Sequence, residues 1–233
     1  MTMHMRPSRS INRISKWLVN WSMASIVTTF IFIVITSYQN VQFFVTGEGK
    51  FLEGGPDFIL GIIDGIIGFV ALILMLYWFY RASKNVRAFG ATGIASPVMA
   101  VVWWFVPFLN LWKPYQVTRN LWKASNPQLD VSSSNGISTG WRDLPSSNNI
   151  KLWWILGLLY FFVNIISRIV TSSLYYSDSE QTAQALTIIH EGIFYSNLFV
   201  IVADILFIFS IIFFIRVIKG VSMRQEIRGG YSI

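Results

Sequence analysis

Four long apolar stretches constrain this chain more than any other feature of its sequence. They occupy residues 17–38, 58–80, 152–175 and 193–218. Each has about 20 residues or a little more, the length at which a helix spans the ~30 Å hydrocarbon core of a bilayer. Because no water satisfies backbone polar groups inside a bilayer, a stretch that crosses it must be helical. The sequence therefore predicts an all-α integral membrane protein built as a four-transmembrane-helix bundle.

The composition excludes the main alternatives. Of the 233 residues, 54% are hydrophobic and only 12% are charged, whereas soluble domains carry about 25% charged residues. A soluble globule of this composition would expose large apolar patches, and a disordered chain would be far more polar. The chain has no cysteine and only two histidines, so we expect no disulfide and no metal or haem cofactor.

The positions of the charges predict how the chain is oriented in the membrane. Sixteen of the 18 basic residues lie in an N-terminal arm (1–16), a middle loop (81–151) and the C-terminal end (216–233). The loops 39–57 and 176–192 contain one basic residue and six acidic ones. Lys and Arg accumulate on the cytoplasmic side of membrane proteins. We therefore expect four crossings with both termini in the cytoplasm, and a single transmembrane domain over 17–218 that lies between the arm and a cytoplasmic tail (219–233).

The loop between the second and third stretches contains a further apolar element. Residues 97–112 are too few to cross a bilayer as a helix, and Pro107 interrupts them. We expect residues 92–124 to form a cytoplasmic-side re-entrant or interfacial helical element, with its broken backbone covered by protein. Residues 125–150, rich in Ser, Asn and Gly, are typical of a flexible linker.

Residues 114–124 have the pattern of a short amphipathic helix. Val117 and Leu121 share one face of that helix, and Arg119 and Lys123 share the other. A basic amphipathic helix of this kind lies in the membrane interface. We therefore expect Arg119 and Lys123 to contact anionic lipid headgroups, each gaining about 1 kcal/mol from that attraction.

Three ionisable residues lie inside the predicted spans: Asp64, Arg168 and Asp204. A charge at the bilayer centre costs roughly 2.5–3.5 kcal/mol on insertion scales, so we expect these residues to face inward, with Arg168 bridging the two aspartates. Helical spacing places Asn164 beside Arg168 and Asn197 beside Asp204. This intramembrane polar seam has two interpretations. One is a structural ion pair that fixes helix register, and the other is a functional seam, either a path for protons or ions or a binding site for a small anion on Arg168.

The middle region also carries a dense pattern of Trp, Pro, Asn and basic residues. It contains Tyr80-Arg81-Ala82-Ser83-Lys84-Asn85, then Trp103-Trp104-Phe105-Val106-Pro107-Phe108-Leu109-Asn110-Leu111-Trp112-Lys113-Pro114-Tyr115, then Leu121-Trp122-Lys123-Ala124-Ser125. Over residues 80–125 the chain resembles the bacterial membrane family known as domain of unknown function 4328. The resemblance implies a multi-pass protein of the bacterial cytoplasmic (inner) membrane and brings no activity, cofactor or catalytic residue. The residues that carry it, the family-pattern residues, are Arg81, Asn85, Trp104, Pro107, Asn110, Pro114, Tyr115 and Trp122.

Elementary chemistry gives these positions a structural interpretation. Asn85 and Asn110 can bond the backbone groups that Pro107 and Pro114 leave unpaired. We also expect Tyr115 to anchor the interfacial helix together with Trp122. The pattern would then build a folded ledge at the cytoplasmic side of the bundle.

The sequence contains no set of nucleophile, base and orienting group, and no phosphate-binding glycine loop, so we expect no enzyme activity. The preferred hypothesis is a scaffold or accessory subunit that docks a membrane-protein partner or a second copy, helped by small residues on the second span, Gly61, Gly65 and Gly68. The alternatives are a small transporter or channel that uses the seam, and a lipid-binding or membrane-sensing protein. Nucleic acid is not expected as a partner, because the basic residues flank a bilayer.

Overall fold

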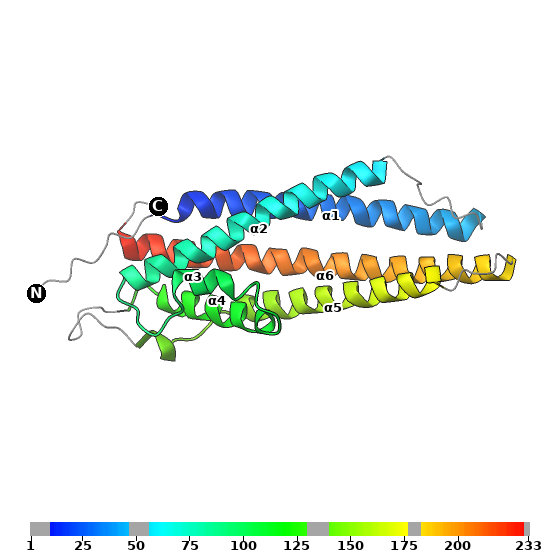
Figure 1. Cartoon of the computed structure of the whole chain (residues 1–233). Coiled ribbons are helices and arrows are strands. Elements are labelled where there is room, and N and C mark those ends of the chain that lie inside the picture. Colours follow the sequence, from blue (N-terminus) through cyan, green and yellow to red (C-terminus); the bar gives the residue numbers. More distant parts are fainter. Residues whose placement is uncertain (1–9, 47–55, 130–139, 177–182, 231–233) are drawn as a thin grey trace, which may run out of the picture. The chain divides into compact units, whose positions relative to one another are not determined.

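The computed structural model describes residues 10–46, 56–129, 140–176 and 183–230, and these residues form helices and no strand. Four long helices follow the four apolar stretches (Figure 1): α1 (Asn12–Thr46), α2 (Pro56–Ala88), α5 (Asn148–Tyr176) and α6 (Ala183–Gly229). All four are long and apolar enough to cross a membrane, which confirms the all-helical prediction and the positions of the four stretches. Residues 1–9, 130–139 and 231–233 of the predicted arm, linker and tail lie outside the described residues.

Each long helix extends beyond the apolar stretch that it contains. The longest, α6, has 47 residues, or about 70 Å at 1.5 Å per residue, more than twice the ~30 Å hydrocarbon core. Extra turns lie at both kinds of end: α2 continues to Ala88 and α6 to Gly229 at the basic ends, while α1 continues to Thr46 and α6 begins at Ala183 at the acidic ends. The predicted C-terminal tail is therefore mostly a continuation of α6.

Short helices connect α2 to α5. They are α3 (Pro97–Val102), the 3₁₀ turn η1 (Leu109–Leu111), α4 (Lys113–Ala124) and the 3₁₀ turn η2 (Gly140–Asp143). Ser96 caps α3 by accepting a hydrogen bond from the Met99 N–H at 3.2 Å, and Pro97 occupies its first turn, where a missing N–H costs nothing. The helical character expected for residues 92–124 is thus present.

A glycine ends α2. The Gly90 N–H bonds the Arg87 carbonyl at 3.0 Å, and the Ala91 N–H bonds the Val86 carbonyl at 3.1 Å. This pair of bonds is a Schellman motif, which needs a residue in the left-handed region at the position of Gly90. Gly90 has φ of 83° there, a conformation that costs a glycine little.

The segment predicted as a flexible linker is packed at both of its described ends. Ser125 is fully buried and Trp141 is only 3% exposed. The Trp141 indole N–H donates to the Thr92 carbonyl at 3.2 Å, which holds η2 against the loop after α2. The linker prediction is wrong for these residues. The free energy gained by burying one large aromatic side chain exceeds the free-energy cost of ordering the Ser and Asn residues around it.

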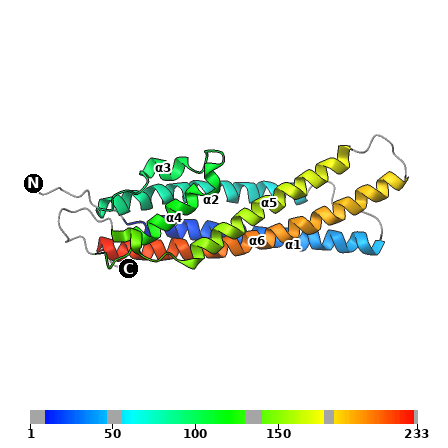
Figure 2. The same cartoon turned by 90° about the horizontal axis from the view of Figure 1, so that it is seen from below.

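The described chain divides into two compact units, each built from parts of the four long helices. The basic unit comprises residues 10–23, 68–129, 140–154 and 212–230, and includes all the short helices. The span unit comprises residues 24–46, 56–67, 155–176 and 183–211. Figure 2 shows α3 and α4 beside one end of the long helices, within the basic unit.

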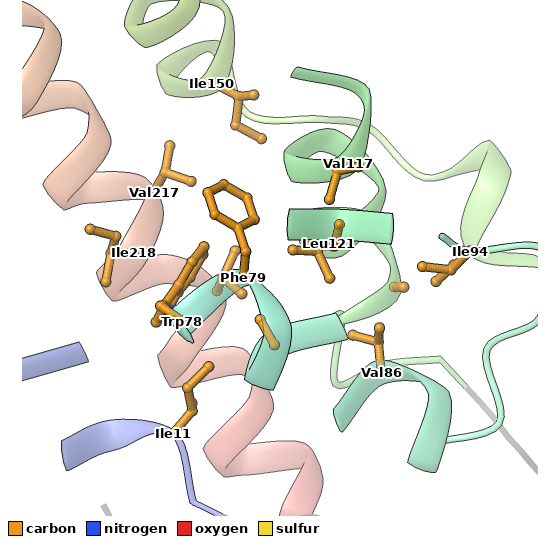
Figure 3. Packing of buried hydrophobic residues seen from close by; sticks show 14 of the residues in the cluster. Ile11, Trp78, Phe79, Val86, Ile94, Val117, Leu121, Ile150, Val217 and Ile218 are labelled. Atoms are coloured by element: carbon orange, nitrogen blue, oxygen red, sulfur yellow. The ribbon is translucent and has the colours of Figure 1, made fainter. Parts of the chain in front are cut away.

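The hydrophobic core of the basic unit centres on α2, α4 and α6, and Leu18 of α1 and Ile150 and Trp153 of α5 belong to the same cluster. Trp78 and Phe79 on α2 are fully buried and point toward Val217 and Ile218 on α6 (Figure 3). Leu121, also fully buried, brings α4 into the same cluster. The face of α4 that carries Leu121 is therefore packed against protein, whereas the predicted interfacial helix would place this apolar face in the membrane.

Candidate functional site in the basic unit

A buried polar network joins α1, α2 and α6 at the centre of the basic unit. The Trp78 indole N–H lies between two hydroxyl oxygens, at 3.1 Å from Ser15 Oγ and 3.3 Å from Ser222 Oγ. The two hydroxyls are 2.6 Å apart, and all three side chains are buried. Because unpaired buried polar atoms are costly, the three groups specify how the helices fit together.

A second network centres on Gln225, a residue that the sequence analysis did not identify. Its Oε1 accepts from Asn85 Nδ2 at 3.0 Å, and its Nε2 donates to the Ala82 carbonyl and to Ser125 Oγ. Gln225 is 1% exposed and therefore links α2, α4 and α6 from inside the core. Asn85 serves this network, and its bonding to groups freed by the prolines stays a prediction.

The buried carboxylate of Glu226 caps the first turn of α1. Its Oε1 accepts from the Ser10 hydroxyl at 2.8 Å, the Ile11 N–H at 2.8 Å and the Asn12 N–H at 3.1 Å. A negative charge at a helix N-terminus satisfies free N–H groups and interacts favourably with the helix dipole. The same contact brings the start of α1 and the end of α6 together.

Two arginines of α6 bond the C-terminal ends of neighbouring helices. Arg224 donates to the Trp122 carbonyl of α4 at 3.0 Å. Arg228 donates to the Ala124 carbonyl and, at 3.2 Å, to the Phe89 carbonyl at the end of α2. Cations at helix C-termini satisfy free carbonyls and complement the dipole. These charges therefore hold the basic unit together.

The family-pattern residue Trp122 packs closely against α6. A Cβ atom added to Gly220 would overlap the Trp122 ring, so only glycine allows this approach. The Arg224 guanidinium lies 4.0 Å from the centre of the ring on which it stacks, a favourable cation–π arrangement. The expected anchoring role of Trp122 is thus filled by a helix–helix contact.

Trp104, another family-pattern residue, lies in an aromatic cluster. Its ring centre is 5.5 Å from that of Phe79 on α2, and 6.4 Å and 6.1 Å from those of Trp153 and Trp154 on α5. Trp154 in turn donates its indole N–H to the Leu111 carbonyl of η1 at 3.0 Å. The segment between α3 and α4 is therefore fixed to both α2 and α5.

The remaining family-pattern residues divide between the interior and the surface. Pro114 is buried in the first turn of α4, and its carbonyl accepts from the Thr118 hydroxyl at 2.7 Å. Tyr115 is half-buried, whereas Pro107 and Asn110 are exposed. The side-chain bonds expected from Asn110 to groups freed by the prolines are absent among the described residues. Two buried donors of the pattern, Arg81 Nε and Trp104 Nε1, have no acceptor within the described chain.

The two cations expected at lipid headgroups differ in position. Arg119 is exposed on α4, as the amphipathic pattern predicts. Lys123 is 7% exposed and donates to the Arg142 carbonyl of η2 at 2.7 Å. The headgroup prediction is therefore wrong for Lys123, because η2 covers this end of α4 and supplies an acceptor for its ammonium group.

The predicted polar seam lies in the span unit. Asp64 accepts a hydrogen bond from Thr28 Oγ1 at 2.6 Å, which joins α2 to α1. Asp64 on α2, Arg168 on α5 and Asp204 on α6 all belong to this unit, as does Tyr160 on α5.

The expected bridge between Arg168 and the aspartates is not formed. Among the described residues no ion pair joins Arg168 to either one, and its side chain is exposed. The Thr28 hydroxyl, and not a cation, is the hydrogen-bond partner of the Asp64 carboxylate. Asn164 donates to the Tyr160 carbonyl of its own helix at 3.3 Å, and Asn197 donates to Asn40 Oδ1 at 3.0 Å, which joins α6 to α1.

The comparison with protein families agrees with the sequence pattern. The family described as Domain of unknown function (DUF4328) matches residues 57–223. The chain belongs to this family. The match extends well beyond the middle region, from the start of α2 into the last turns of α6, and so includes Gly220 and Ser222 of the networks described above. No curated protein and no solved structure matches the chain.

Proposed function

We propose that this family member is a scaffold or accessory subunit of a complex in the bacterial cytoplasmic membrane, without enzyme activity of its own. The observation that carries the proposal is the use of the family pattern. Asn85, Trp104, Pro114 and Trp122 are engaged in packing and hydrogen bonds that shape the basic unit. Residues that fix the shape of a unit, and carry out no chemistry, are typical of a module that docks a partner.

The proposed topology has four crossings with both termini on the cytoplasmic side. The contact between Glu226 and the first turn of α1 supports it, because an even number of crossings returns the chain to its starting side. Charge supports it as well. In the described part of the basic unit nine exposed side chains are cationic and one, Asp143, is anionic, as expected for a cytoplasmic end.

We propose that the partner docks on the outer face of the last turns of α6. Arg216, Lys219, Met223 and Ile227 recur at intervals of three or four residues and are all exposed, so they share one face of the helix. This face combines apolar side chains with cations and fits a membrane-protein partner or a second copy with a complementary acidic surface. Anionic headgroups are the other partner proposed for the exposed cations, Arg119 included.

Site-specific cross-linking tests this proposal. A photoreactive residue at Met223 or Ile227 is introduced into the full chain, irradiated in native membranes and extracted gently. We expect one stoichiometric cross-linked species from these positions and none from a matched probe at Asp143. A clean monomer from all three positions would contradict the scaffold function.

A second candidate function, transport of protons or a small ion, rests on the span unit. The observation that favours it is the presence of Asp64, Asp204 and Arg168 in the apolar helices of this one unit, since intramembrane charges commonly mark ion pathways. Flux into liposomes that disappears in Asp64→Asn and persists in Thr28→Ser would support transport. The absence of flux for protons, common ions and small anions would exclude it.

A further inference from the structure

Helix α3 and the segment that follows it up to α4 expose several large apolar side chains. They are Val98 (60% exposed), Val102 (36%), Phe105 (64%), Phe108 (79%) and Trp112 (43%), together called the apolar tip. On the opposite side of the segment, Ala100 is fully buried and Trp104 lies in the aromatic cluster. The segment therefore has one face packed on the protein and one apolar face without a covering among the described residues.

Two contacts determine how deep this segment lies. Leu111 accepts a hydrogen bond from Trp154 on α5, and Trp104 contacts Phe79 on α2 and Trp153 on α5. Phe79 is at the end of one predicted span, and Trp153 and Trp154 are at the start of another. The apolar tip therefore lies at the level where the long helices leave the hydrocarbon, the level at which aromatic side chains accumulate in membrane proteins.

The backbone of the tip turns Phe108 outward. Phe108 has φ of 61°, in the left-handed region that is unfavourable for a residue with a large side chain. It is also the most exposed member of the tip. A strained turn that exposes a phenylalanine is unfavourable in water and favourable where the ring enters an apolar phase.

The direction and charge of the segment agree with a lipid environment. In Figures 1 and 2 the turn after α3 points away from the end of the basic unit at which α6 finishes. Lys113 follows the tip, with its ammonium 5.5 Å from the centre of the Trp103 ring, and Arg119 is exposed on α4. Cations that follow an apolar tip match anionic headgroups above acyl chains.

We propose that the apolar tip inserts into one leaflet of the bilayer, the leaflet at the basic end of the long helices, with Phe105 and Phe108 among the acyl chains. The tip is a shallow anchor and not a fifth crossing, because Leu111 and Trp104 are fixed at the boundary of the spans. The inference rests on the proposed topology. It assigns lipid, and not a protein partner, as the occupant of this surface.

The absence of native cysteine allows a direct test with the full chain. Phe108→Cys and Phe105→Cys are each labelled with a polarity-sensitive fluorophore and reconstituted into vesicles of phosphatidylethanolamine and phosphatidylglycerol. Quenching by nitroxides on the acyl chains is compared with quenching by aqueous iodide. Phe161→Cys, on the exposed face of α5 inside a predicted span, and Asp143→Cys, exposed on η2, are the two controls.

We expect Phe108→Cys and Phe105→Cys to be quenched by the acyl-chain nitroxides, as Phe161→Cys is, and protected from iodide. Asp143→Cys is expected to behave in the opposite way. Quenching of the tip positions by iodide alone would overturn the inference, and protection from both quenchers would overturn it in favour of a protein occupant. If Phe161→Cys itself fails to be quenched from the lipid, the proposed topology fails, a result distinct from failure of the tip alone.

Discussion

Replacing Glu226 by glutamine removes the charge that caps α1 while keeping an oxygen at the same place. The carboxylate accepts three hydrogen bonds, two of them from backbone N–H groups. A bond to a charged acceptor contributes about 1.5–3 kcal/mol and a neutral one about 0.5–1.5 kcal/mol. The change also removes about 0.3–1 kcal/mol of favourable interaction with the helix dipole. It avoids the free-energy cost of burying a charge, which offsets part of the loss.

Together these contributions predict a loss of about 2–3 kcal/mol in the free energy of unfolding for Glu226→Gln. Glu226→Ala is expected to lose more, because it leaves the Ile11 N–H without its acceptor and the Asn12 N–H with only the Ser10 hydroxyl at 3.3 Å. At about 2–4 °C per kcal/mol for a chain of this length, the glutamine variant should lower the Tm by roughly 5–10 °C. Tryptophan fluorescence during heating in detergent micelles measures this shift, and hydrogen exchange at the first turn of α1 localises it.

The matched control is Asp143→Asn, which removes the exposed carboxylate of the same unit. A surface charge contributes little, so we expect its Tm to stay within about 1 °C of the wild type. If Glu226→Gln unfolds at the same temperature as Asp143→Asn and exchange in the first turn of α1 is unchanged, the capping role is refuted.

Two further substitutions test the packing of the basic unit. Gly220→Ala would drive a methyl group into the Trp122 ring and should lower the free energy of unfolding by about 1–3 kcal/mol. The control is Gly61→Ala, which should leave the Tm unchanged because an added Cβ meets nothing within 4 Å there. Equal Tm values for the two variants would contradict the close helix contact. Leu121→Ala removes a fully buried side chain and should cost about 2–5 kcal/mol in thermal or denaturant unfolding, while a matched change at the exposed Met223 should have little effect.

Hydropathy is sufficient to predict the four long helices. It does not predict that they continue as helices beyond the ends of their apolar stretches. Beyond residue 218 the chain becomes polar and basic, and its hydropathy predicts a tail. Buried residues nevertheless continue along α6 at helical spacing, at Ile218, Val221, Ser222 and Gln225. Two of these four positions are polar, Ser222 and Gln225, so a pattern based on apolar residues does not detect the helical spacing.

The candidate site was predictable in position and not in detail. The family pattern correctly located the packed segment between α2 and α5. The partners of its side chains lie far away along the chain, such as Gln225 for Asn85, 140 positions away, and Gly220 for Trp122. A single sequence does not encode these pairings in any local spacing. Lys123 is an example: the helical wheel placed it on the polar face, and only the position of η2 explains its burial.

The central claim is that the four long helices cross a membrane and leave the first turn of α1 and the last turn of α6 on the same side. Single cysteines at Arg13, Ile227 and Phe44, labelled with an impermeant maleimide in oriented vesicles, test it most directly. We expect Arg13→Cys and Ile227→Cys to react from one side and Phe44→Cys from the other. Reaction of Arg13→Cys and Ile227→Cys from opposite sides, or of all three from the same side, would contradict it.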